Sequence, residues 1–119
     1  MGRDRRLRKT ADFQAVQRQG RSWANQMIVL RARPNGMDTS RVGFSVSRRV
    51  GKAVVRNQAK RRLRELVRQI PVQEGWDMVL IARAPAAQKD FHHLREAVED
   101  LFRRAGVTQV SPSRGKEIR

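Results

Sequence analysis

A dense run of basic residues between Arg48 and Arg68 contains the side chains with the clearest chemical potential in this sequence. Nine residues of the run are basic and Glu65 is its one acid; the basic set is Arg48, Arg49, Lys52, Arg56, Lys60, Arg61, Arg62, Arg64 and Arg68. Guanidinium groups bind phosphate through paired hydrogen bonds and stack on exposed bases, whereas lysine acts mainly as a point charge. The run therefore indicates a phosphate-bearing partner, and its excess of arginine favours structured RNA.

Helical spacing places many of these residues on one side of a predicted helix over residues 52–70. Apolar residues recur there at three- and four-residue steps and form a stripe for the core: Val55, Ala59, Leu63, Leu66, Val67 and Ile70. Each helical residue advances by about 100°. The neighbouring arc, called here the basic ridge, consists of Arg56, Asn57, Lys60, Arg61, Arg64 and Arg68. A merely solvated face would interleave acids to form i,i+4 pairs, so that interpretation is the weaker one.

The composition of the whole chain also indicates a polyanionic partner. The 119 residues fit one domain, and 27 Lys and Arg against 11 Asp and Glu give a formal charge of +16. Such charge repels itself in a compact state and usually exists because nucleic acid, an anionic membrane or an acidic protein is bound. No stretch approaches the roughly 20 apolar residues of a membrane span. The absence of cysteine fits a reducing compartment, so we expect a cytoplasmic nucleic-acid-binding protein and no membrane partner.

The segments before the basic run predict a helix and two strands. Thr10 is expected to cap a helix that ends near Gln19. Residues 26–33 are predicted to form a strand, and the turn at 35–38 predicts that it pairs as a hairpin with a strand over 41–47. In that second strand Val42, Phe44 and Val46 alternate with Gly43, Ser45 and Ser47. One face of the strand should therefore be buried, and the other should be available to solvent or ligand.

The segments after the basic run complete an α/β (α+β) two-layer sandwich. Residues 77–83 are almost continuously apolar, which predicts a strand covered on both faces. Asp90 is expected to cap a final helix that extends to Ala105. The predicted order is α-β-β-α-β-α, with room for an additional short strand, and its helices pack on a mixed sheet. We divide the chain into a basic arm (1–9), one RNA-binding domain (10–106) and a disordered tail (107–119).

No group of residues in the sequence resembles a catalytic centre or a metal site. His92 and His93 are adjacent, so on a helix they diverge by about 100° and cannot hold a metal as an i,i+4 pair would. The carboxylates are scattered, and two-metal phosphodiester hydrolysis requires them clustered. No candidate nucleophile has a base beside it. We therefore predict neither catalytic residues nor protein ligands for a metal.

Several linked segments resemble one family, the bacterial ribonuclease P protein component. The run VGKAVVRNQAKRRLRE (50–65) is similar to that family's signature, Arg-Asn-x-x-Lys-Arg-x-x-Arg, here Arg56, Asn57, Lys60, Arg61 and Arg64. The segments RLRKTADFQAVQRQGR, ANQMIVL, RVGFSVSRRVG, DMVLIAR and LFRRAG follow in the family's order and spacing. A basic helix alone would be weak support, but together these segments cover roughly residues 5–106.

The resemblance implies a fold, a reaction and a partner. The fold would be similar to a domain of a small-subunit ribosomal protein, with a left-handed βαβ crossover. A catalytic RNA with Mg²⁺ would cut the 5′ leader from precursor tRNA, and the protein would use no small-molecule substrate. The residues expected to bind the catalytic RNA are Lys52, Arg56, Asn57, Lys60, Arg61, Arg62, Arg64 and Arg68.

The resemblance also implies that a cleft between the first helix and the open sheet face holds the single-stranded leader. A single strand needs stacking surfaces and a cationic floor. The residues expected there are Arg8, Lys9, Phe13, Ser45, Ser47, Arg48 and Arg49. Gln17, Ile28 and Arg31 stand where relatives often carry aromatics, so we expect less stacking and more ionic contact.

Two other functions compete with this one. A structural RNA-binding protein, for example of the ribosome, would have the same composition, and the linked segments are what favours ribonuclease P. An autonomous metal nuclease is disfavoured because the acids do not cluster.

Overall fold

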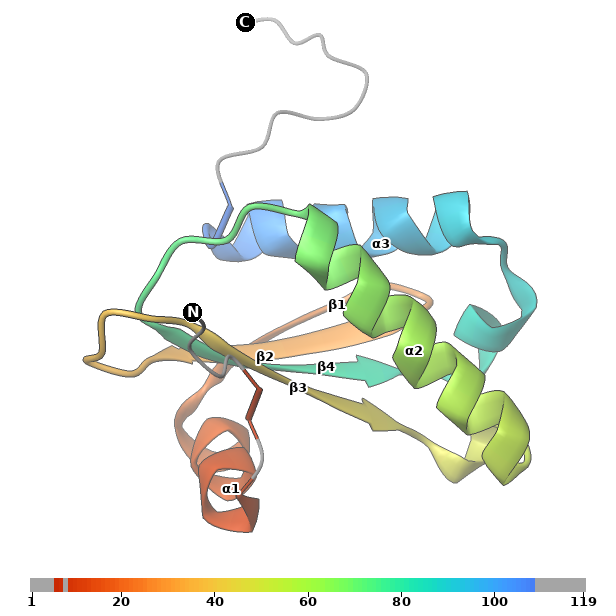
Figure 1. The fold of residues 1–119 in the computed structure, drawn as a ribbon, viewed down its shortest axis with the longest axis horizontal. Helices are drawn as coiled ribbons and strands as arrows, with labels where there is room; N and C mark the ends of the chain where they lie inside the picture. The colour runs from red at the N-terminus through yellow and green to blue at the C-terminus, as the bar shows by residue number, and fades with distance from the viewer. Residues whose placement is uncertain (1–5, 8, 109–119) are drawn as a thin grey trace, which may run out of the picture.

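Three helices and a four-stranded sheet make up the computed structural model, which describes residues 6–7 and 9–108 (Figure 1). The elements in chain order are α1 (Thr10–Gln19), β1 (Arg21–Ala24), β2 (Ile28–Pro34), β3 (Arg41–Val46), the 3-10 turn η1 (Arg48–Val50), α2 (Ala53–Gln69), β4 (Trp76–Ala82), the 3-10 turn η2 (Ala84–Gln88) and α3 (Phe91–Ala105). The expected α+β class is confirmed, and β1 is the additional short strand. Lys9 rather than Thr10 occupies the N-cap position of α1, so that prediction is wrong by one residue.

The strand order β1-β2-β4-β3 corrects the predicted hairpin between β2 and β3. β4 lies between them, antiparallel to β2 and parallel to β3. β2 forms its hairpin with β1 instead, because the side-chain oxygen of Asn25 accepts hydrogen bonds from the backbone N–H groups of Met27 and Ile28 (3.1 and 3.0 Å). The segment after β2 therefore crosses past the position of β4 and leads to β3 at the opposite edge of the sheet from β1.

Burial on both faces explains the central place of β4, as its apolar run predicts. Met78, Leu80 and Ala82 are fully buried in the main core, on the face covered by α2 and α3 (Figure 1). Val79 and Ile81 face the opposite side, where α1 packs (Figure 1). The sheet thus has one fully covered face and one face that α1 covers in part.

The helix α2 connects the parallel strands β3 and β4 and so forms a βαβ unit. Its buried residues are Ala59, Leu63 and Leu66, with Ile70 directly after its end, which confirms the predicted apolar stripe. The left hand of the crossover stays a prediction. α3 also follows its sequence signals, because Asp90 accepts a hydrogen bond from the backbone N–H of His93 (2.9 Å) and Gly106 ends the helix at a φ of 77°.

The folded domain extends a little beyond residues 10–106 at both ends. Val107 is fully buried and its carbonyl accepts from the Gln73 backbone N–H (2.8 Å), while the Thr108 hydroxyl donates to the Pro71 carbonyl (2.6 Å). In the arm, Leu7 is buried and its backbone N–H donates to the carbonyl of Val42 on β3 (3.0 Å). The rest of the predicted tail (109–119) and of the arm (1–5 and 8) lies outside the described residues.

Candidate nucleic-acid interface

The packing of α2 turns the basic ridge outward. Leu63 and Leu66 are fully buried against the sheet and α3, which fixes the rotation of the helix about its axis. Ridge residues consequently occupy the opposite and flanking positions; Asn57, Arg61 and Arg68 are exposed, and Arg56, Lys60 and Arg64 are half-buried. The structure therefore brings all six predicted ridge residues onto one continuous side of one helix.

Almost no carboxylate neutralises the ridge. Within the described part of the chain, Arg68 is the one ridge residue with an ion-pair partner, Glu65 at 3.4 Å. The Nε atoms of Arg56 and Arg64 are buried without any hydrogen-bond acceptor. A buried donor without a partner loses its hydrogen bond to water and gains nothing in return. The guanidinium groups of Arg56 and Arg64 therefore keep hydrogen-bonding capacity that the described residues do not satisfy.

The other two predicted RNA-binding residues of this region lie outside the ridge. Lys52 is exposed at the N-cap position of α2. Arg62 is directed toward the segment before α3, where its Nη1 atom donates to the carbonyl of Lys89 at 3.3 Å. Arg62 thus contacts the segment before α3, on the opposite side of the apolar stripe from the basic ridge.

A second candidate surface lies where α1 packs on the sheet. Phe13 of α1 is half-buried, in a small cluster with Leu7, Val16 and Val79. Its ring rests against the backbone of β3 at Gly43, so closely that a Cβ atom at Gly43 would lie 2.5 Å from the ring's Cζ atom. Glycine at this position is what allows the aromatic ring to lie on the strand.

The remaining predicted leader residues follow β3 from this point. Ser45 lies two residues beyond Gly43 and so faces the same side of the sheet. The Ser47 hydroxyl oxygen accepts from the backbone N–H of Arg49 (3.1 Å) and caps η1, which presents Arg48 and Arg49 to solvent. Lys9 is exposed before α1, and Arg8 lies outside the described residues.

Two arginines of β2 belong to the same face as Phe13. Arg31 pairs with Val79, which pairs with Gly43 on its other side, so these residues form one row across the sheet. The Nη2 atom of Arg31 donates to the Gln17 carbonyl (2.5 Å) and the Nη1 atom of Arg33 donates to the Gln19 side chain (2.5 Å). Sequence reasoning noted Arg31 but missed Arg33, which the alternation of β2 could have identified.

Ile28 lies in a different environment from Gln17 and Arg31, the two residues grouped with it in the sequence analysis. It is fully buried in the main core, on the face of the sheet covered by α2 and α3. Ile28 is therefore a core residue, whereas Gln17 and Arg31 belong to the surface where α1 packs on the sheet.

An ion pair missed by sequence reasoning joins α1 to the sheet. Arg41 on β3 donates two hydrogen bonds to the carboxylate of Asp77 on β4 (2.9 and 2.7 Å) and a third to Asp12 of α1 (3.3 Å). Burial alone would raise the pKa of Asp77, but hydrogen bonds from Arg41 and Asn35 outweigh it and lower that pKa below its ordinary value. The same hydrogen bond with Asp77 raises the pKa of Arg41 above its ordinary value. Both groups are held in their charged forms.

The described His, Asp and Glu side chains are scattered over the fold. Among residues 6–7 and 9–108, no three His, Asp or Glu side chains gather closely enough to hold an ion. None of the helices in the same part of the chain is long and apolar enough to cross a membrane. What the described residues offer is a cationic helix and an aromatic residue beside an arginine-bearing sheet face.

These features together define a small α+β nucleic-acid-binding protein. The Ribonuclease P family model matches residues 1–106, and the chain belongs to this family. It is 48% identical over 116 residues to the ribonuclease P protein component of Roseiflexus castenholzii, which covers 95% of both chains. Its fold is similar to the solved structure of the Staphylococcus aureus RNase P protein (TM-score 0.80, 34% identity, 90% of this chain and 100% of the other). The Thermotoga maritima RNase P protein is also similar (TM-score 0.74, 39% identity, 83% and 96%).

Proposed function

We propose that this subunit of ribonuclease P binds the catalytic RNA through α2 and holds the 5′ leader of precursor tRNA along the face shared by α1 and β3. The RNA performs the cleavage, and the protein raises the affinity of the complex for its substrate. The partners are the catalytic RNA and precursor tRNA, and the complex acts in the cytoplasm.

One observation carries the assignment of the catalytic RNA to α2. Arg56, Lys60, Arg61 and Arg64 have no carboxylate partner among the described residues, although they lie on one helix face. Such a charge density is unfavourable for the free protein and becomes favourable when phosphates neutralise it. Binding then releases counterions from the RNA, which makes the affinity strongly dependent on salt.

The leader is assigned to the other face by the chemistry available there. Phe13 offers part of an aromatic ring to a base, and Arg31 and Arg33 offer guanidinium groups nearby. Exposed Lys9, Arg48 and Arg49 lie at the two ends of this face and can contact the phosphates of a strand that crosses it. Single strands are bound by this combination of stacking and cationic contact, largely without regard to sequence.

Magnesium belongs to the RNA in this proposal. The described acidic side chains do not form a ligand group, so they do not fit a resident metal ion. Mg²⁺ bound by RNA phosphates can stabilise the charge that develops during phosphodiester cleavage. The protein's cations contribute by reducing the repulsion between two RNA molecules that must approach closely.

Reconstitution tests this function and separates its rivals. The full chain is mixed with the cognate catalytic RNA at low Mg²⁺ concentration, and cleavage of precursor tRNA is followed over time. Stimulation of cleavage supports the proposal, and its absence rejects it in favour of a structural RNA-binding protein. Cleavage by the protein without the RNA would instead establish an autonomous nuclease.

A further inference from the structure

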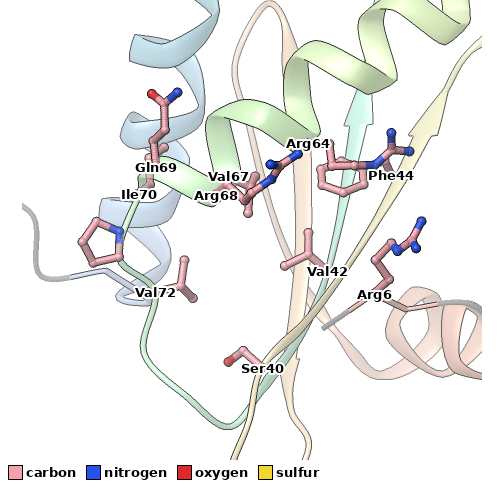
Figure 2. Close-up of a pocket in the computed structure, with 11 residues that line it drawn as sticks. Arg6, Ser40, Val42, Phe44, Arg64, Val67, Arg68, Gln69, Ile70 and Val72 are labelled. Atoms are coloured by element: carbon pink, nitrogen blue, oxygen red, sulfur yellow. The ribbon is translucent and has the colours of Figure 1, made fainter. Parts of the chain in front are cut away.

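A groove separates the second half of α2 from the edge strand β3 (Figure 2). It lies on the face of the sheet opposite to Phe13, because Val42 and Phe44 alternate along β3 with Gly43, where the Phe13 ring rests. Its volume is about 810 Å³, within the range of sites that bind small organic groups. Val42, Val67, Ile70 and Val72 provide apolar walls, and Arg6, Arg64 and Arg68 are the charged residues that line it. None of the described residues that line the groove is acidic.

Phe44 and Arg64 lie side by side at one end of this groove. The guanidinium carbon of Arg64 lies 5.9 Å from the centre of the Phe44 ring, and both side chains border the open space (Figure 2). This geometry is a cation–π contact and holds the guanidinium beside the ring. The Nε atom of Arg64 is buried without an acceptor, and no carboxylate among the described residues pairs with its guanidinium, so the other N–H groups of Arg64 can donate to an incoming anion.

We infer that this groove binds one unstacked base of a single-stranded RNA segment, with the adjoining phosphate on Arg64 and Arg68. The inference rests on the proposed function, because it assumes that RNA is the partner of α2. It adds a specific base-binding site to a helix whose other expected contacts are electrostatic.

The lining favours a nucleotide over other occupants. A nucleotide combines a flat, largely apolar base with an anion, which matches an apolar floor bordered by arginines and by Phe44. An apolar peptide would cover Val67 and Val72 but would bring no negative charge to Arg64 and Arg68. An inorganic anion would satisfy Arg64 but would leave the apolar walls exposed to water. Continuity supports the nucleotide too, because Arg64 and Arg68 belong both to the groove and to the basic ridge.

Methyl NMR on the full chain tests the inference directly. Resonances of Val67 and Val72 report on the groove, and Val54, which is 73% exposed on the first turn of α2, is an internal control outside it. The probes are single-stranded hexamers of adenylate and of uridylate, with inorganic tripolyphosphate as an anion without bases. A base in the groove shifts the Val67 and Val72 methyl signals upfield through its ring current. Tripolyphosphate should not reproduce these shifts.

A blocking substitution gives an independent measurement. Val67→Trp fills the groove and should weaken hexamer binding about tenfold, the loss expected when one stacked base is excluded. His92→Trp places the same side chain on an exposed position of α3 and should leave the affinity unchanged. Thermal melting checks that both variants are folded. If Val67→Trp does not fold, the methyl experiment on the unsubstituted protein still tests the inference.

The outcomes separate this inference from the proposed function. Groove methyl signals that stay unchanged while hexamers bind elsewhere, or shifts that tripolyphosphate reproduces, would overturn the base site and leave the proposed function intact. Absence of hexamer binding also rejects the base site. Upfield groove shifts in a protein that fails to stimulate the catalytic RNA would instead support the base site and reject the proposed function.

Discussion

Arg41 and Asp77 face each other in register on the parallel strands β3 and β4, and two hydrogen bonds of 2.9 and 2.7 Å join the guanidinium to the carboxylate. The Asp77 side chain is 1% exposed and that of Arg41 is 22% exposed, so water hardly competes for the carboxylate. The third bond of Arg41, to Asp12, holds α1 against the sheet. The pair with Asp77 thus fixes the guanidinium that also binds Asp12, the residue before Phe13 on α1.

Asp77→Ala should lower the free energy of unfolding by about 3 kcal/mol, because it leaves the Arg41 guanidinium half-buried without its main partner. Urea denaturation measures this loss. Glu65→Ala is the matched control, since it breaks the exposed pair with Arg68 and should change stability by less than about 1 kcal/mol. Equal losses in the two variants would show that burial does not strengthen the Arg41–Asp77 pair.

The lowered pKa of Asp77 predicts how stability depends on pH. A carboxyl whose pKa is lower in the folded protein stabilises it at any pH above the ordinary value, which is 3.8 for Asp77, and this contribution is lost as the pH falls through the folded pKa. Thermal unfolding of the wild type should therefore become easier below about pH 4. Asp77→Asn should lose less stability than the wild type over the same interval. Parallel pH curves for the two proteins would contradict the prediction.

Arg61→Ala should weaken binding to the catalytic RNA and reduce the slope of log K against log salt concentration by about one unit, if Arg61 contacts one phosphate. Filter binding over a range of salt concentrations measures the slope. Arg104→Ala is the control, because Arg104 lies on α3 and already pairs with Asp100 at 3.2 Å. An unchanged slope for Arg61→Ala would mean that the basic ridge is a solvated surface.

Phe13→Ala should weaken binding of precursor tRNA by about 1–3 kcal/mol if a leader base stacks on the ring, and binding of mature tRNA should be unaffected. Affinities of the reconstituted complex for the two RNAs give the difference. Phe13→Leu keeps most of the buried volume and should lose stacking with a smaller loss of stability. Equal losses for both RNAs, explained by a fall in thermal stability, would assign Phe13 to the core.

Gly43→Ala tests the contact between the ring and the strand. The added methyl group would lie 2.5 Å from the Cζ atom of Phe13, so the ring must move, at a cost of about 1–3 kcal/mol in stability. In a Phe13→Ala background the same substitution should cost much less, because the obstructing ring is gone. A double-mutant cycle measured by urea denaturation gives this coupling. Additive effects would mean that Leu7, with its Cβ at 3.2 Å, carries the clash instead.

Local sequence signals predicted the elements of this fold with small errors. The apolar stripe of α2, the Asp90 cap and the Gly106 stop act within a few residues of one another, so the sequence displays them directly. The basic ridge follows from the same helical period. Strand pairing is different, because nothing in β2 or β3 reveals that a strand more than 30 residues further along the chain will separate them.

The features of the candidate site also differ in whether local sequence patterns reveal them. The ridge residues are identifiable from residue type and spacing, whereas the family resemblance is what singles out Phe13. The Arg41–Asp77 pair, the closeness of Phe13 to Gly43 and the groove beside Phe44 each join residues that are distant in sequence. Such relationships depend on the three-dimensional packing of the chain, and local patterns carry no information about them.

The central position of β4 has a consequence for how the chain folds. Residues 76–82 supply a partner to both β2 and β3, so the four-stranded sheet cannot form until this late segment has been synthesised. Until then β3 lacks a strand partner and β2 has one unpaired edge, and such edges promote aggregation. Pairing at this separation also slows folding, because loop entropy is lost before any contact forms. Insertion of β4 thus completes the sheet against which α2 and α3 pack, and with it the sheet's part in supporting the basic ridge.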